Sequence, residues 1–236
     1  MTPTTTERLS TGSEIIDGIT GGGYERDAVT TIYGPAGAGK TNLALLAALT
    51  CIKEGKKALY MDTEGGFSIE RLRQITNKHE EFLQQVFFLQ PTTFDEQVKA
   101  FEELKKIAEQ KNIGLIIVDT ISMLYRLERS FTGETKEFNR EIGLQIVTLN
   151  KIAREKKIPV IITSQIYKNF ETGEITMVAG EMLKYGSKCL LELQTLTEGK
   201  RRIQLKKHRS LPINMEALFE IVQEGIAPIK KSFKIF

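Results

Sequence analysis

The sequence predicts an α/β fold, with a mostly parallel central sheet flanked by helices and an antiparallel hairpin extension near the C-terminus. Short apolar runs with strand composition alternate with segments of helical periodicity along most of the chain. The glycine-rich segment Gly34–Thr41 joins one such run directly to a helical segment. After Met177 strand-like runs follow one another without helices between them, which indicates antiparallel pairing.

The expected strands are rich in Val, Ile, Leu or aromatic residues, and several stop at a polar residue. They are Ala28–Tyr33, Lys57–Met61, Val86–Leu89, Ile113–Val118 and Pro159–Thr163. The expected helices fill the gaps; Gly55 ends the first and Ser68 caps the second. They are Lys40–Glu54, Ser68–His79, Asp95–Gln110 and Glu134–Lys157. We find no internal repeat.

The C-terminal part of the chain has a different sequence pattern, in which strand-like runs are joined by turn residues. Cys189–Leu196 and Arg201–Lys207 are expected to form a hairpin, because the turn residues Thr197–Gly199 lie between them. A further strand at Leu218–Val222 would extend the sheet with antiparallel pairing. Tyr167–Ala179 shows no periodicity and is expected to be a mobile loop.

Length and composition predict one domain. A chain of 236 residues with 41% hydrophobic content can bury one sizeable core, so we expect a single domain over 1–236, with a short lead at 1–8 and a basic tail at 229–236. No leader and no apolar run near the ~20 residues of a bilayer span occur, which predicts a cytoplasmic protein. Cys51 and Cys189 fit neither a disulfide framework nor a metal-ligand spacing, so both are expected to be reduced and buried.

Positive charge is concentrated at the C-terminal end. The net charge is +3, but residues 181–236 hold 11 Lys and Arg against 6 Asp and Glu, which leaves −2 for the preceding part. Such a region can attract a polyanion through phosphate contacts and counterion release, which makes nucleic acid a candidate partner. An ordinary solvated surface is the alternative.

The strongest chemical signal is the glycine-rich segment, which follows a strand and opens a helix as a phosphate-binding loop does. Its backbone N–H groups can surround a phosphate, the Lys40 ammonium can reach the β- and γ-phosphates, and the Thr41 hydroxyl can bind Mg²⁺. ATP and Mg²⁺ are therefore the expected ligands. The expected nucleotide-binding residues are Gly34, Pro35, Ala36, Gly37, Ala38, Gly39, Lys40, Thr41 and Asn42.

Two carboxylates end apolar strands beyond this loop. Asp119 follows Leu115–Val118 and is expected to act on the metal through its water shell, with Thr120 assisting. A buried strand that merely ends in a polar residue is the alternative. Glu64 follows Tyr60–Asp62 and is expected to be the general base that orients and deprotonates the attacking water, although a capping or turn acid fits the local sequence equally.

These segments carry a family resemblance. Leu9–Asp17, Gly21–Gly23, the phosphate loop, Asp62–Gly65 and Val118–Asp119 occur in the order found in recombinases, and Leu124–Arg126 follows. The chain resembles the RecA/RadA strand-exchange family, and most of all the short archaeal paralogue of RadA, from about Glu7 to Pro228. The resemblance implies a RecA-like P-loop ATPase core.

The family pattern assigns two more nucleotide residues. It implies that Glu64 is the catalytic glutamate, that Arg71 lies against the adenine ring, and that Gln165 senses the γ-phosphate and links it to the loop that follows. A guanidinium can stack on an aromatic face, but an arginine on a surface helix is more often solvated. A glutamine at a strand end can also be structural.

The DNA-facing loops of the family would fall near Leu127–Glu137 and Tyr167–Lys184. They offer Arg126, Arg129 and Lys184 but lack other expected basic residues, and Tyr185 stands where recombinases have a phosphate-sensing histidine. These departures argue against efficient strand exchange and against normal DNA-triggered ATPase activity.

A further departure is a run of four potential cations at Lys206, Lys207, His208 and Arg209. One hypothesis is that they reach the γ-phosphate of a neighbouring subunit, as the cap lysines of bacterial RecA do. The competing hypothesis is that they bind the DNA backbone.

Partners and assembly follow from the resemblance. Met1–Thr6 offers no aromatic anchor for a neighbouring subunit, so we expect a monomer or homodimer rather than a stable filament. The resemblance implies a weak ATPase that binds DNA, preferably single-stranded, supports homologous recombination and repair, and contacts the main RadA recombinase and repair nucleases or polymerases. The alternatives are a KaiC-like signalling ATPase and a non-hydrolysing, nucleotide-gated scaffold.

Overall fold

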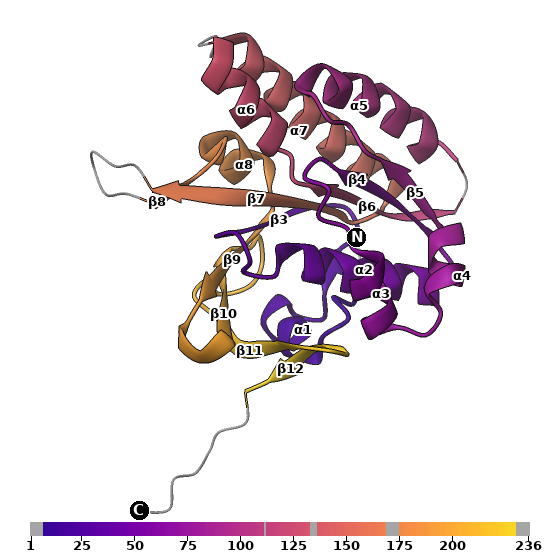
Figure 1. Ribbon diagram of the computed structural model, residues 1–236, viewed down its shortest axis with the longest axis vertical. Helices are drawn as coiled ribbons and strands as arrows, with labels where there is room; N and C mark the ends of the chain where they lie inside the picture. The colour runs from indigo at the N-terminus through magenta and orange to yellow at the C-terminus, as the bar shows by residue number, and fades with distance from the viewer. Residues whose placement is uncertain (1–6, 111, 133–135, 169–174, 230–236) are drawn as a thin grey trace, which may run out of the picture.

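A broad twisted sheet organises the protein (Figure 1). The computed structural model describes residues 7–110, 112–132, 136–168 and 175–229. Within these residues the sheet has ten strands, nine of them in the order β12-β11-β10-β9-β3-β7-β6-β4-β5, and β8 pairs with β7. Because consecutive strands of the chain are often not neighbours, helical crossovers connect them, as the alternating sequence pattern predicts.

The strands that pair in parallel, from β9 to the edge strand β5, match the strands expected from the sequence. They are β3 (Val29–Gly34), β4 (Lys57–Asp62), β5 (Val86–Leu89), β6 (Ile113–Asp119), β7 (Val160–Lys168) and β9 (Cys189–Thr195). The mostly parallel α/β fold is therefore confirmed.

The C-terminal strands extend the sheet with antiparallel pairing, which confirms the expected hairpin. They are β10 (Lys200–Lys207), β11 (Glu216–Val222) and β12 (Gly225–Pro228), with a short 3-10 turn, η1 (Thr197–Gly199), between β9 and β10. Two short strands, β1 (Arg8–Leu9) and β2 (Tyr24–Glu25), form a separate antiparallel pair.

Helices cover both faces of the sheet (Figure 1). On one side lie α1 (Glu14–Thr20), α2 (Lys40–Lys53), α3 (Ile69–Ile75) and α4 (His79–Gln84); on the other lie α5 (Phe94–Ala108), α6 (Met123–Thr132), α7 (Lys136–Lys156) and α8 (Gly180–Gly186). Successive residues of a strand point to opposite faces. Thus in β6 Leu115 and Ile117 join the core under α2, whereas Ile116 and Val118 join the core under α5 and α7.

Two expected elements differ from the structure. The helix expected over Ser68–His79 is two short helices, because Thr76 has an extended backbone (φ −147°) that ends α3 and α4 begins only at His79. Ser68 does cap α3, since its hydroxyl accepts a hydrogen bond from the Arg71 amide at 3.1 Å.

The two segments expected to be DNA-facing loops also contain regular structure. Helix α6 covers Leu127–Thr132, because Leu124 and Tyr125 anchor its first turn in the core. In the segment Tyr167–Ala179, β7 continues to Lys168 and β8 (Ile175–Met177) pairs back on it, while 169–174 lie outside the described residues.

The cysteines behave as expected. Cys51 and Cys189 are buried and free, and burial raises the pKa of each thiol to about 12, so neither is a thiolate at neutral pH. In the described ranges, no helix has the length and apolar character to cross a membrane.

Candidate nucleotide-binding site

The signals singled out in the sequence meet at one edge of the sheet. Parallel strands end at the same edge, and the register places Gly34 of β3 beside Gln165 of β7, and Asp62 of β4 beside Asp119 of β6. Ligands of open parallel sheets bind outside the carboxyl ends of the strands. The topology therefore brings the phosphate loop and the predicted catalytic groups together.

The phosphate loop has the backbone geometry that a phosphate cradle requires. Gly37 and Gly39 have φ of 72° and 105°, which favour glycine. A Cβ at Gly34 would lie 2.4 Å from the Leu193 carbonyl oxygen, so only glycine allows β3 to approach β9 here. The amides of Gly37, Gly39, Lys40 and Thr41 donate to no group in the described part of the chain. These free donors at the start of a 14-residue helix fit an anionic ligand.

Lys40 adds a buried positive charge to this cradle. Its side chain is almost fully buried, and Nζ donates to the carbonyl oxygens of Gly34 at 3.1 Å and Pro35 at 2.9 Å. Burial lowers the pKa of Lys40, and the nearby Glu64 and Asp119 carboxylates partly offset that effect. Within the described residues the ammonium bonds only to carbonyls, so a phosphate would give it the charged partner that it lacks.

Asp119 is held rigidly beneath the loop. Its carboxylate accepts a hydrogen bond from the Tyr60 hydroxyl at 2.8 Å and another from the Thr163 hydroxyl, and the residue is buried. Both oxygens already have a protein donor. An aspartate fixed in this way suits an indirect contact to a metal, through water, better than a direct one.

Glu64 projects from the loop after β4 into the space above Asp119. Its Oε1 accepts hydrogen bonds from Thr120 Oγ1 at 3.2 Å and Gln165 Nε2 at 2.8 Å, whereas Oε2 accepts none from any described residue. Burial raises the pKa of Glu64, and the negative charge of Asp119 adds to the increase. A carboxylate that is positioned through one oxygen, has the other oxygen free and carries a raised pKa has the features of a general base.

Asp62 shapes the loop that presents this glutamate. Its Oδ1 accepts from the amides of Glu64 at 3.2 Å and Gly66 at 3.1 Å, and its Oδ2 accepts from the amide of Phe67 at 3.0 Å. In the sequence Asp62 stands out only as part of the segment Asp62–Gly65. Its own role is to hold the backbone turn, since an aspartate side chain commonly accepts hydrogen bonds from backbone amides a few residues further on.

The donor set fits Mg²⁺ bound together with phosphates. The Thr41 hydroxyl has no hydrogen-bond partner among the described residues, and a Cβ at Gly66 would lie 3.6 Å from it, so it faces the loop after β4. The described residues contain no group of three or more His, Cys, Asp or Glu side chains that could hold a metal. One hydroxyl with a nearby aspartate is a suitable protein contribution for Mg²⁺, which keeps several waters and phosphate oxygens as ligands.

Arg71 lies where the base of a nucleotide could rest, but it is not an ordinary solvated arginine. Its Nε donates to Asn42 Oδ1 at 2.7 Å, and its terminal nitrogens donate to Gln74 and to the β11–β12 turn. The acceptors in this turn are the carbonyls of Val222, Gln223 and Gly225. All donors of the guanidinium edge are used, so only its flat faces are available for stacking on a ring.

Two residues near the loop were not predicted from the sequence. Arg201 of β10 extends to the Gly37 carbonyl oxygen at 3.4 Å, and a Cβ at Gly39 would meet the Ile221 side chain of β11 at 2.8 Å. Both belong to the antiparallel extension. No local motif marks them, because only the pairing of β9 with β3 brings the extension to the phosphate loop.

The predicted DNA-binding residues are spread over separate elements. Arg126 is exposed on α6, and the side chain of Arg129 lies outside the described residues. Lys184 on α8 forms an ion pair with Glu181 at 2.8 Å, and Tyr185 is 80% exposed.

The run Lys206–Arg209 does not act as one cationic cluster. Arg209 pairs with Glu25 at 2.8 Å and with Asp27 at 2.5 Å, and the buried His208 ring lies 3.8 Å from Glu25. Lys207 donates to the Lys184 carbonyl oxygen. Lys206 is 3.6 Å from Glu192, beside the outer wall of the phosphate loop. Lys206 and Lys207 diverge because successive residues of β10 face opposite sides, whereas His208 and Arg209 follow the end of the strand and both approach Glu25.

Comparison with known proteins agrees with this geometry. The Rad51 family model matches residues 4–229. The chain belongs to the Rad51 family. Within this family it is similar to two proteins named "DNA repair and recombination protein RadB". That from Methanococcoides burtonii is 36% identical, covering 93% of this chain and 97% of the relative, and that from Methanococcus maripaludis strain C7 is 40% identical, covering 93% and 100%.

The structural comparison supports the same assignment. A solved structure described as the RadB recombinase matches with a TM-score of 0.80 at 36% identity, and the match covers 94% of this chain and all of that one. The resemblance to the short RadA paralogue and the RecA-like fold are thereby confirmed.

Proposed function

We propose that this Rad51-family chain binds ATP with Mg²⁺, hydrolyses it slowly, binds DNA and supports homologous recombination and repair. The observation that carries the ATPase part is Glu64. It is held by Thr120 and Gln165, its Oε2 accepts no hydrogen bond from the described residues, and its charge acts on the Lys40 ammonium of the phosphate loop. The names of the RadB relatives support the recombination part.

Each residue has a defined task in this proposal. The amides of the phosphate loop and Lys40 bind the phosphates, and Thr41 with Asp119 holds Mg²⁺, directly and through water respectively. When bound, Mg²⁺ neutralises the charge of the β- and γ-phosphates. Glu64 Oε2 accepts a proton from the attacking water, while Gln165 keeps the carboxylate oriented.

Gln165 also connects the site to the DNA-facing part of the protein. It lies on β7, which continues to Lys168 and pairs with β8, and its amide holds Glu64. A phosphate that attracts either group would alter this contact. We therefore propose that Gln165 communicates the nucleotide state to the segment after β7, as its family position implies.

DNA binding is proposed for exposed cations rather than for the whole basic run. Arg126, Lys184 and Lys206 are exposed, whereas Arg209 is engaged by two carboxylates. Single-stranded DNA is the proposed ligand, with the main RadA recombinase and repair nucleases or polymerases as partners. We expect a monomer or homodimer, and long homopolymers in sedimentation with ATP would contradict this.

The experiment that tests the proposal compares wild type with Glu64→Gln and Lys40→Ala. Glu64→Gln is expected to lower ATP hydrolysis by roughly 10²–10⁴-fold with nucleotide affinity nearly unchanged. Lys40→Ala is expected to weaken ATP binding by roughly 10- to 100-fold, because it removes charge-assisted hydrogen bonds. Lys53→Ala at the exposed far end of α2 is the matched control.

The measurements are equilibrium ATP binding, single-turnover hydrolysis and salt-dependent binding of single-stranded DNA. Equal hydrolysis by Glu64→Gln and wild type would show that no carboxylate-driven step exists, which would favour the nucleotide-gated scaffold. Undiminished, Mg²⁺-dependent ATP binding by Lys40→Ala would exclude the proposed phosphate site.

A further inference from the structure

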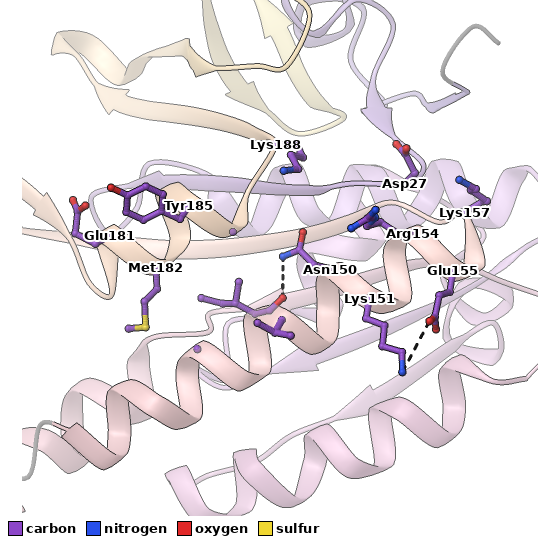
Figure 2. A pocket seen from close by; sticks show the side chains of 14 residues that line it. Asp27, Asn150, Lys151, Arg154, Glu155, Lys157, Glu181, Met182, Tyr185 and Lys188 are labelled. Carbon is purple, nitrogen blue, oxygen red and sulfur yellow. Dashed lines mark hydrogen bonds and ion pairs between the residues drawn. The ribbon is translucent and has the colours of Figure 1, made fainter. Parts of the chain in front are cut away.

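A second hollow lies on the opposite side of the sheet from α2, between α7 and α8 (Figure 2). We call it the α7–α8 groove and define it by Val147, Arg154, Lys157, Met182, Tyr185 and Lys188. Its volume is about 1070 Å³. None of these residues belongs to the nucleotide site, so the groove has no role in the proposed ATPase.

One end of the groove is apolar. Met182 and Tyr185 of α8 lie at this end (Figure 2), and Val147 of α7 is 65% exposed while Tyr185 is 80% exposed. Leu144, one turn before Val147 on α7, is 47% exposed and extends the same surface. Large apolar side chains that remain this accessible, together in one hollow, mark an interaction surface more often than isolated exposed ones do.

The floor of the groove is preformed. Helix α8 packs closely on α7, since a Cβ at Gly186 would lie 2.3 Å from Ile146 Cγ2. Ile146 is buried beneath this contact. A partner would therefore meet a fixed surface, which reduces the entropy cost of binding.

The other end of the groove is cationic. Arg154, Lys157 and Lys188 are exposed, and their side chains form no hydrogen bond or ion pair with any residue in the described ranges. Arg154 and Lys157 gather with Asp27 at this end in Figure 2.

The carboxylates that line the groove already have partners. Asp27 is held by Arg209 at 2.5 Å, Glu181 by Lys184 at 2.8 Å and Glu155 by Lys151 at 4.0 Å. Within the described residues, the groove therefore presents three cations without an ion-pair partner at one end, of which Lys157 acts on Asp27 from a distance, and apolar surface at the other.

We propose that the α7–α8 groove docks an acidic, amphipathic segment of a partner protein. Carboxylates of the segment would meet the three free cations, and an aromatic or branched aliphatic side chain would pack on Val147, Met182 and Tyr185. A nucleic-acid backbone fits less well, because it requires cations along its whole path. The open surface, with Val147 and Tyr185 largely exposed, is also unlike the enclosed pocket of a small ligand.

The test uses a displayed library of random peptides selected on the full wild-type chain. We expect enrichment of sequences that combine Asp or Glu with an aromatic or branched apolar residue. Selected peptides should bind Arg154→Glu/Lys157→Glu, and separately Val147→Ser, at least about tenfold more weakly than wild type, and high salt should weaken binding to wild type.

The matched control is Lys99→Glu/Lys106→Glu, which makes the same change of charge at exposed positions on α5. It should bind the peptides as wild type does. Unchanged ATP affinity and thermal unfolding would show that the groove variants are folded. Val147→Ser tests the apolar end even if the double charge reversal fails to fold.

Three results would overturn the proposal. Selected peptides could lack acidic residues or bind the groove variants as well as wild type. A single-stranded oligonucleotide could lose affinity for the charge-reversal variant while the peptides do not, which would make the groove a nucleic-acid surface. Sedimentation could show a wild-type dimer that Val147→Ser converts to monomer, which would place a second copy of the chain in the groove.

Discussion

The edge of the sheet that carries the phosphate loop and the cationic run Lys206–Arg209 both stand out in the sequence, but they differ in how the fold uses them. At the sheet edge, residues from four strands converge, and Glu64, Thr120 and Gln165 share hydrogen bonds. At the end of β10 and just after it, Lys206 and Lys207 take different partners, and His208 and Arg209 share the Glu25 carboxylate. Residues distant in sequence therefore meet in one site here, because parallel strands end together, whereas adjacent cations in the sequence do not form one site.

The largest expected effect is at the edge itself. Gly34→Val should destabilise the protein by about 3 kcal/mol or more and abolish nucleotide binding, because its Cβ would start 2.4 Å from the Leu193 carbonyl oxygen. Chemical denaturation and ATP titration would measure both losses. Gly18→Ala in α1 is the control, since no atom lies within 4 Å of its Cβ and alanine favours a helix by up to ~1 kcal/mol. Equal stability of the two variants would show that the close approach of β3 and β9 is not a constraint.

The central strands were predicted well because a strand that is covered by helices on both faces is a continuous apolar run, and such short runs are easy to recognise in the sequence. Ile113–Val118 is an example, since the observed strand β6 (Ile113–Asp119) is buried throughout and differs from the expected one by a single residue. Gly37 and Gly39 could be recognised in the sequence because their positive φ angles favour glycine, so the loop is visible as a glycine-rich segment.

Tertiary contacts decided the parts that were mispredicted. The extended backbone of Thr76 ends α3, and Lys78 stands at the N-cap position of α4, although no Gly or Pro in the sequence marks this break. Arg201 reaches the phosphate loop only because β9 pairs with β3. A charge run also does not reveal its partners: Glu25 and Asp27, which hold Arg209, lie more than 180 residues earlier, as the separation of 182 between Asp27 and Arg209 shows.

A smaller effect on stability is expected within the run Lys206–Arg209, where Arg209 and Lys206 should differ. Arg209→Ala should cost about 1–3 kcal/mol of stability, because it leaves the buried Glu25 with fewer partners and removes the pair with Asp27. Lys206→Ala should change stability by less than about 0.5 kcal/mol, since its ion pair is exposed. Urea unfolding of both variants would measure the difference. Loss of DNA affinity in Arg209→Ala with unchanged stability would contradict the structural role.

The pair between Arg209 and Asp27 also makes the stability of the protein depend on pH. The hydrogen bond from Arg209 lowers the pKa of Asp27, so this interaction contributes stability above the ordinary pKa of an aspartate and loses it as the pH falls through the lowered value. Arg209→Ala should therefore flatten the acid limb of a stability profile, which wild type and Lys206→Ala should share.

The smallest expected effect is a shift in the pH profile of ATP hydrolysis. Burial and Asp119 raise the pKa of Glu64, so the loss of rate on acidification should begin at a higher pH than an ordinary glutamate would give. Thr120→Val removes a hydrogen bond that lowers this pKa, so it should move the acid limb of the rate profile to still higher pH. Thr50→Val is the control, because it loses only a hydrogen bond to the Leu46 carbonyl and should leave the acid limb unchanged. Single-turnover rates across the acidic range would measure the shift. Identical acid limbs in wild type and Thr120→Val would mean that Glu64 does not control the rate, and the convergence of strands at this edge would then serve binding alone.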